Sequence, residues 1–273
     1  MKIILAKNLG FCFGVKRALG LSEKSLKESK KPVYFLGEVI HNEKITREIK
    51  ERGGKFISAP KEAKSGTLVI RAHGTPPLPS LKNLLIVDAT CPLVKKAQIG
   101  AQALLRADYR VIIIGDKKHP EARGILGYVK NKAIVIESEG EAKKLKGLGK
   151  IGVVAQTTQD LKKVNKILKI LKRKVKELKW LNTLCPQVLF RQKELRQILK
   201  KVDGVLIIGS HSSANTSHLA EIAKKSNKLA QWINSPKEID KKILQDYAVL
   251  GVVSGTSTPD WVIEKIVDRL KNF

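Results

Sequence analysis

The chain alternates between short apolar runs and longer stretches with helical spacing. The apolar runs are rich in β-branched residues, and each is followed by a turn signal and then by apolar positions three or four residues apart. This alternation is typical of repeated βα units and parallel sheets. We expect twelve strands, near residues 2–6, 33–36, 54–57, 67–71, 84–88, 110–115, 132–136, 150–155, 175–180, 203–208, 228–232 and 248–253.

The expected strands fall into three groups, which Cys91 and Cys185 separate. Each group predicts an α/β module with a mainly parallel four-stranded sheet. The third group holds three strands, so the N-terminal strand is left over to complete it. We therefore expect a first module over 13–90, a second over 91–184, and a third over 185–273 that is completed by residues 1–12.

The charge balance is strongly basic, with 53 Lys and Arg against 25 Asp and Glu and a formal net charge of +28. The lysines follow the expected amphipathic helices, as in the stretch 162–174, and form no single arm or tail. We interpret them as solvated helix faces and do not expect nucleic acid as a partner, since no helix-turn-helix or aromatic-rich recognition strand is present.

The apolar run at the N-terminus is too short for a secretion signal, and no later run approaches the length of a membrane span. We expect a cytoplasmic protein that does not enter a membrane. The chain has three cysteines, Cys12, Cys91 and Cys185, at long spacings. An odd number without an export signal argues against a disulfide framework.

Each cysteine follows an expected strand and opens an expected helix. Pro92 and Pro186 come directly after Cys91 and Cys185, and proline favours the first helical turn, so cap-like positions are expected for both cysteines. Helix N-termini lower thiol pKa values and favour anionic ligands. Three such cysteines fit a closed zinc site poorly, because that site takes four ligands at short spacings. They fit an iron–sulfur cluster with one iron free of protein ligands, and the alternative is three buried small apolar side chains.

Three of the five histidines lie at or after the ends of expected strands, namely His41, His73 and His119. Open α/β sheets place ligands at these ends. Glu121, two residues after His119, is a candidate proton donor, although a glutamate in a first helical turn also complements the helix dipole. Small hydroxyl residues occur at further strand ends, where they serve either as helix caps or as a phosphate cradle. These segments are 156–158, 209–216 and 254–259.

With these motifs in order, the chain resembles the 4-hydroxy-3-methylbut-2-enyl diphosphate reductases, the LytB/IspH family, along essentially its whole length. The matching motifs are Gly10-Phe11-Cys12-Phe13-Gly14-Val15-Lys16-Arg17-Ala18, His41-Asn42, Arg71-Ala72-His73-Gly74, Asp88-Ala89-Thr90-Cys91-Pro92-Leu93-Val94, His119-Pro120-Glu121, Gln156-Thr157-Thr158, Arg191-Gln192 and Gly255-Thr256-Ser257-Thr258-Pro259.

The resemblance implies a trefoil of three α/β modules around one 4Fe–4S cluster per chain. Cys12, Cys91 and Cys185 would be its ligands, and the iron without a protein ligand would bind the substrate hydroxyl. Glu121 would supply the proton that lets the hydroxyl leave as water. The residues implied to contact substrate are His41, His73, Ser213, Asn215 and Ser257 at the diphosphate, with His119 and Thr157 near the proton path.

The reaction implied is the last step of the non-mevalonate isoprenoid pathway. In that step, two electrons convert the substrate to isopentenyl and dimethylallyl diphosphate. The partners implied are reduced ferredoxin or flavodoxin, and we expect a monomer or a weak homodimer. The sequence departs from the family where a threonine usually follows the third cysteine, which is Val188 here, and where Ala214 replaces a serine. These departures leave a degenerate family member open as an alternative. A non-redox iron–sulfur dehydratase, which would also use a three-cysteine cluster, is the other alternative.

Overall fold

The computed structural model describes residues 1–272 and contains the twelve expected strands, whose ends agree with the sequence pattern to within about two residues. The strands are β1 (Lys2–Leu5), β2 (Val33–Leu36), β3 (Lys55–Ile57), β4 (Gly66–Ile70), β5 (Leu84–Asp88), β6 (Arg110–Ile114), β7 (Ala133–Ile136), β8 (Lys150–Ala155), β9 (Glu177–Trp180), β10 (Gly204–Ile208), β11 (Leu229–Ile233) and β12 (Val249–Ser254).

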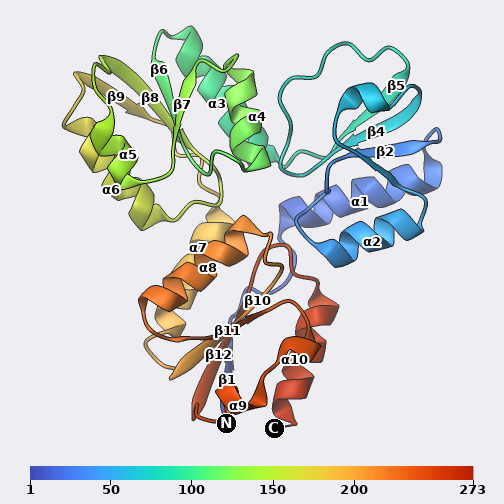
Figure 1. Cartoon of the computed structure of the whole chain (residues 1–273), viewed down its shortest axis with the longest axis vertical. Coiled ribbons are helices and arrows are strands. Elements are labelled where there is room, and N and C mark those ends of the chain that lie inside the picture. The colour runs from blue at the N-terminus through green and yellow to red at the C-terminus, as the bar shows by residue number, and fades with distance from the viewer. Residues whose placement is uncertain (273) are drawn as a thin grey trace. The chain divides into compact units, whose positions relative to one another are not determined.

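Helices connect the strands (Figure 1). They are α1 (Phe13–Glu28), α2 (Glu43–Glu51), α3 (Pro92–Arg106), α4 (Pro120–Tyr128), α5 (Glu139–Lys144), α6 (Leu161–Lys172), α7 (Pro186–Ile198), α8 (Ala214–Lys225), α9 (Lys241–Leu244) and α10 (Asp260–Lys271), with short 3-10 turns η1 (Pro60–Glu62) and η2 (Pro236–Glu238).

The strands form three four-stranded sheets, with orders β3-β2-β4-β5, β7-β6-β8-β9 and β1-β12-β10-β11. Every pairing within the sheets is parallel. Parallel sheets need crossover helices and are covered on both faces, which explains the continuous apolar runs in the sequence. The predicted fold class, three α/β modules with parallel four-stranded sheets, is confirmed.

The third sheet combines the two ends of the chain, because β1 forms its edge beside β12, with Lys2 opposite Val249 and Leu5 opposite Val252. Helices α7 and α8 cover one face of this sheet, and α9 and α10 lie on the other (Figure 1). Both faces bury aliphatic side chains. This close packing holds the strands, and the loops at their C-terminal ends therefore begin at fixed positions.

The described residues divide into two compact units. The first unit consists of Met1–Lys16, His41–Arg47 and residues 186–272, and contains the third sheet. The second consists of Arg17–Ile40 and Glu48–Cys185, and contains the first two sheets. The expected module boundaries at 13–90, 91–184 and 185–273 stay predictions. Among the described residues, no helix has both the length and the apolar character needed to cross a membrane.

Candidate functional site

The three cysteines occupy equivalent positions in the three sheets. Each follows an edge strand, β1, β5 or β9, and immediately precedes the first residue of a helix. Cys91 is the N-cap of α3, with φ −58° and ψ 134°, and Pro92 is the first helical residue. Cys185 likewise precedes Pro186 at the start of α7, and Cys12 precedes α1. The cap-like placement expected for Cys91 and Cys185 agrees with this geometry.

The backbone of each cysteine is held by the strand next to its own edge strand. The Cys12 N–H donates to the Thr256 carbonyl at 3.1 Å, after β12, and the Cys91 N–H donates to Ala72 at 2.9 Å, after β4. The Cys185 N–H donates to Thr157 at 2.9 Å, after β8. The same hydrogen bond therefore occurs once in each sheet.

The other candidate side chains follow this threefold pattern. Counted inward from the edge strand that precedes the cysteine, the next strand of each sheet is β4, β8 or β12. The loop after it carries His73, Thr157 or Ser257, respectively. The next strand of each sheet, β2, β6 or β10, is followed by the remaining candidates. His41, His119 and Ser213 lie in the loops after these strands, and Glu121 and Asn215 lie in the first turns of α4 and α8. All candidates thus lie beyond the C-terminal ends of equivalent strands, where open α/β sheets bind ligands.

The cysteines suit a metal centre by their chemistry. None of the three forms a disulfide, all are half-buried, and each directly precedes a helix. Thiolates are the ligands of iron–sulfur clusters. Each sheet contributes one cysteine, so the described residues include three candidate ligands of this kind.

In the second unit, Glu121 and Thr157 form a buried pair. Glu121, in the first turn of α4, is 1% exposed. Its carboxylate accepts the Thr157 N–H at 2.6 Å and the Thr157 hydroxyl at 3.0 Å. Burial raises the pKa of Glu121 to about 7; the bonds from Thr157 oppose this rise, and the negative charge of Asp116 adds to it. At neutral pH the carboxyl group is therefore poised to hold and release a proton.

His119 lies two residues before Glu121 and binds its backbone. It is the N-cap of α4, and its Nδ1 accepts the Glu121 N–H at 3.2 Å. With Nδ1 acting as acceptor, the proton of the neutral imidazole resides on Nε2. The ring of His73 meets the ring of His119 edge to face, with centroids 5.3 Å apart. The structure thus brings together the four candidates His73, His119, Glu121 and Thr157.

Sequence reasoning did not single out the polar network behind this group. The Asp116 N–H donates to Gln156 Oε1 at 2.9 Å, and Gln159 Nε2 donates to Asp116 Oδ1 at 3.3 Å. Gln156 and Gln159 are both fully buried. Gln156 belongs to the Gln156-Thr157-Thr158 motif, but Asp116 and Gln159 carry no signal beyond their positions after β6 and β8. The network fixes the carboxylate of Asp116, whose negative charge adds to the rise that burial causes in the pKa of Glu121.

In the first unit, the hydroxyl candidates converge at the N-terminus of α8. Ser213 is the N-cap of α8, and its Oγ lies 3.2 Å from the Oγ of Ser257. Asn42, which follows His41, donates its side-chain amide to the Ser257 carbonyl at 2.9 Å. Asn215 is 2% exposed, and neither its amide nitrogen nor its oxygen has a hydrogen-bond partner among the described residues. A buried amide without a partner is costly and suits a polar ligand.

Glu43 is a residue of this unit that the sequence did not reveal. Its carboxylate accepts the hydroxyls of Ser210 at 2.7 Å and Ser212 at 3.2 Å, and the side-chain amide of Asn234 at 3.2 Å. Burial favours the neutral acid, but these hydrogen bonds hold the pKa of Glu43 below its ordinary value. The hydroxyls of Ser210 and Ser212 are therefore bound to Glu43 of α2, while the hydroxyls of Ser213 and Ser257 face each other.

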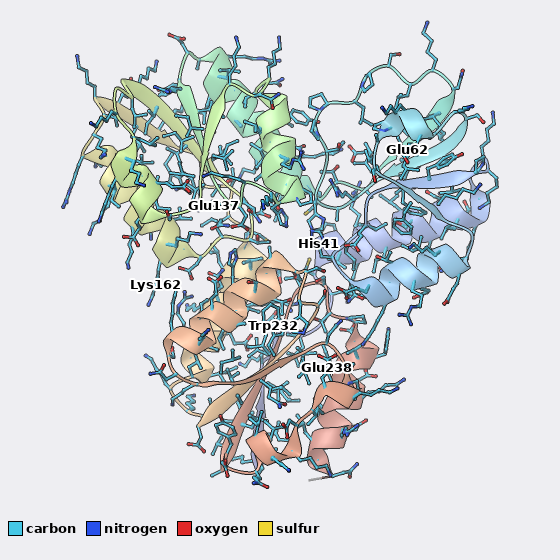
Figure 2. The ribbon with its side chains drawn as sticks, viewed as in Figure 1. His41, Glu62, Glu137, Lys162, Trp232 and Glu238 are labelled. Atoms are coloured by element: carbon cyan, nitrogen blue, oxygen red, sulfur yellow. The ribbon has the colours of Figure 1, made fainter. Side chains whose placement is uncertain are left out.

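His211, which the sequence did not make a candidate, contacts an aromatic ring and a carboxylate. His211 is exposed, its ring lies 4.6 Å from that of Trp232, and its Nε2 is 3.7 Å from Glu238. Figure 2 labels Trp232 and Glu238, and also His41, which precedes α2. The two departures from the family pattern have different settings, because Val188 is 2% exposed within α7 whereas Ala214 is the first residue of α8.

The buried Glu121 makes a prediction for stability. Its folded pKa of about 7 exceeds the ordinary 4.5, so the folded state binds more protons between these values and wild-type stability falls as pH rises through this window. The unfolding free energy should fall by roughly 3 kcal/mol relative to Glu121→Gln. Urea unfolding of both proteins from pH 4 to pH 8 measures this difference, with Glu139→Gln on the surface of α5 as control. A difference independent of pH would contradict the raised pKa.

The chain thus has three parallel α/β sheets with one cysteine directly before a helix in each, and a buried carboxyl group whose pKa is raised, which are the features of an α/β protein with a candidate metal centre. The chain belongs to the LytB protein family, whose model matches residues 3–271. This is a family of iron–sulfur enzymes.

Proteins of known name resemble the chain over its full length. A 4-hydroxy-3-methylbut-2-enyl diphosphate reductase from Geobacter metallireducens is 40% identical and covers 100% of this chain and 98% of the relative. The reductase of that name from Dictyoglomus turgidum is 39% identical, covering 100% and 97%.

Two solved structures are also similar. The E-1-hydroxy-2-methyl-but-2-enyl-4-diphosphate reductase from Plasmodium falciparum has a TM-score of 0.93 at 29% identity, covering 99% of this chain and 88% of that one. A structure of (E)-4-hydroxy-3-methyl-but-2-enyl diphosphate reductase, described as the terminal enzyme of the non-mevalonate pathway, has a TM-score of 0.69 at 38% identity and covers both chains fully.

Proposed function

We propose that the chain catalyses the reductive dehydroxylation of 4-hydroxy-3-methylbut-2-enyl diphosphate to isopentenyl and dimethylallyl diphosphate, the last step of the non-mevalonate pathway. The observation that carries the proposal is the buried Glu121, whose pKa of about 7 suits an acid that must protonate a leaving hydroxyl. Membership of the LytB family and the full-length similarity to reductases of this name support it.

Cys12, Cys91 and Cys185 would hold one 4Fe–4S cluster per chain and leave one iron without a protein ligand. When bound, this group would relay the two electrons from the external donor to the substrate and would offer a Lewis acid to the hydroxyl. The donor set fits this group, because thiolates are the ligands of such clusters, none of the three cysteines forms a disulfide and each lies at a helix start.

Ser213, Asn215 and Ser257 would bind the diphosphate with His41 and His73. The N-terminus of α8 adds backbone N–H groups and the positive end of a helix dipole, which favour anions. Asn215 supports this role most directly, since both polar atoms of its side chain are buried without a partner among the described residues. Cationic histidines would add charge-assisted hydrogen bonds to the phosphate oxygens.

Glu121 would deliver the proton to the leaving hydroxyl. The hydrogen bonds from Thr157 fix the direction of its carboxyl group, and His119 holds the Glu121 backbone through the cap of α4. The network through Asp116 favours the protonated acid. A group that is half protonated near neutral pH can give up its proton and recover it in each turnover.

For its partners, we propose that reduced ferredoxin or flavodoxin supplies electrons and that the enzyme works in the cytoplasm as a monomer or weak homodimer. The net charge of +28 supports an acidic electron donor, because opposite charges accelerate encounter.

Anaerobic turnover tests the proposal. Protein reconstituted with iron and sulfide is mixed with 4-hydroxy-3-methylbut-2-enyl diphosphate and a reduced viologen dye, and dye oxidation is followed. We expect substrate-dependent oxidation and formation of the two isoprenoid diphosphates. Water loss without dye oxidation would indicate a non-redox dehydratase instead. An intact cluster with no reaction would indicate a degenerate member, which the departures at Val188 and Ala214 favour.

Asn215 makes a separate prediction for substrate binding. Asn215→Ala removes a buried amide with no protein partner, so the diphosphate loses up to two hydrogen bonds and KM should rise roughly 10- to 100-fold. The matched variant Ala214→Ser restores the usual hydroxyl beside it and should lower KM by up to about tenfold. Steady-state kinetics with the viologen dye measure both variants. An unchanged KM in Asn215→Ala would remove Asn215 from the diphosphate site.

A further inference from the structure

Arg191 and Glu194 lie one turn apart on α7, and both bind the loop that carries Cys12. The guanidinium of Arg191, a residue only 2% exposed, donates from Nη2 to the Gly10 carbonyl at 2.7 Å. The carboxylate of Glu194 accepts the N–H of Lys7 at 2.6 Å. The loop between β1 and α1 is therefore held at both ends by one helix.

The same guanidinium holds a second loop. Nη1 of Arg191 donates to the carbonyls of Ser254 at 2.8 Å and Gly255 at 3.0 Å, in the loop that continues to Ser257. The Ser254 hydroxyl accepts the Gly10 N–H at 2.9 Å, which ties the two loops to each other. Arg191 thus connects α7, the Cys12 loop and the loop of Ser257.

Only a guanidinium suits this position. A buried cation is costly unless its N–H groups are satisfied, and the planar fork of arginine reaches several carbonyls in fixed directions, which the ammonium of lysine does not. The loop has little freedom of its own, since Gly10 has φ +75° and a Cβ there would lie 1.6 Å from Asp260 Oδ1. The conformation before Cys12 is therefore set by its surroundings.

We infer that Arg191, assisted by Glu194, is a positioning residue of the metal centre. It holds the Cys12 loop in register with α7, the helix whose first residue follows Cys185. The contacts that carry the inference are to backbone carbonyls and one hydroxyl, so the role lies in presenting a ligand. The inference rests on the proposed function, because it takes the cysteines to be cluster ligands.

Cluster retention is the first test. Wild type, Arg191→Gln, Arg191→Lys and Arg196→Gln are reconstituted anaerobically, and their iron and sulfide contents are measured against increasing chelator. Arg196, in the next turn of α7, bonds the Gln192 carbonyl within its own helix and is the matched control. We expect Arg191→Gln to hold the cluster about 10- to 100-fold more weakly, as for other groups that orient metal ligands. Arg191→Lys should be intermediate and Arg196→Gln like wild type.

A second readout requires no cluster. In the metal-free proteins, the rate at which a thiol reagent modifies Cys12 is compared with the rate for Cys91 by mass spectrometry. Loss of the guanidinium should free the loop and speed modification of Cys12 about tenfold, without changing Cys91. Ser254→Ala, a smaller change that removes one bond to Gly10, should act in the same direction and covers the case in which Arg191→Gln does not fold.

The outcomes separate the two ideas. Wild-type rates at Cys12 and wild-type cluster retention in Arg191→Gln would overturn the positioning role. A wild-type protein that binds no cluster would overturn the proposed function. In that case the ratio of Cys12 to Cys91 modification still shows whether Arg191 holds the loop, although its role would then no longer concern a metal centre.

Discussion

Glu121→Gln should lower turnover by about 10²- to 10⁴-fold, the range that a positioned general acid contributes. The amide keeps the shape of the side chain and an oxygen that can accept the Thr157 N–H, so the cluster and the affinity for substrate should be retained. The loss should therefore fall on kcat and leave KM nearly unchanged. Stopped-flow oxidation of the reduced dye, with Glu139→Gln as the control, measures it.

The pH profile of wild type gives the same acid a second signature. Because the pKa of Glu121 is about 7 and the protonated form is the active one, kcat should be constant below that pH. Above it, kcat should fall about tenfold for each pH unit. A profile that stays flat from pH 6 to pH 9, or full activity in Glu121→Gln, would assign the proton to another group.

Replacing any one of the three cysteines should abolish the cluster and with it the turnover. Removal of a group that merely orients a metal ligand lowers metal affinity about 10- to 100-fold. Removal of the ligand itself should lower it further. Cys12→Ala, Cys91→Ala and Cys185→Ala should each lose bound iron, sulfide and visible absorbance. The chain has no fourth cysteine to replace the missing one.

The control for the cysteine variants is a substitution at the start of a helix that has no cysteine there. Ser138→Ala removes the N-cap of α5 and should cost about 1 kcal/mol of stability, with iron content unchanged. A cysteine variant that keeps full iron content and turnover would show that its thiol is not a ligand.

The regular elements were predictable because each depends on a local pattern. The apolar runs of β6, β8 and β10 are buried on both faces, and each is followed by a helix with a polar face. The positions of the cysteines at helix starts followed from Pro92 and Pro186. Sequence alone therefore located the fold class and the ends of the strands where candidate residues lie.

The supporting contacts were not predictable, because they join residues far apart in the chain. Glu43 reads locally as a first-turn glutamate, yet its partners Ser210 and Ser212 lie more than 160 positions away, at separations of 167 and 169. Arg191 stands in the Arg191-Gln192 motif, but nothing local shows what it binds, because its partner Gly10 is 181 positions distant. The local spacing of apolar and polar residues does not predict such distant pairs. The burial of Arg191 likewise becomes visible only in the folded chain.

The place of β1 at the edge of the third sheet has a consequence for synthesis. Its pairing partner, β12, ends at Ser254, so β1 cannot join this sheet until β12 has been synthesised. Cys12 waits with it, since its backbone partner is Thr256. The first two sheets can fold as they emerge, whereas closure of the third is strongly non-local and late. Assembly of the proposed metal centre, which would take one thiol from each sheet, would therefore follow the synthesis of β12 and of Thr256.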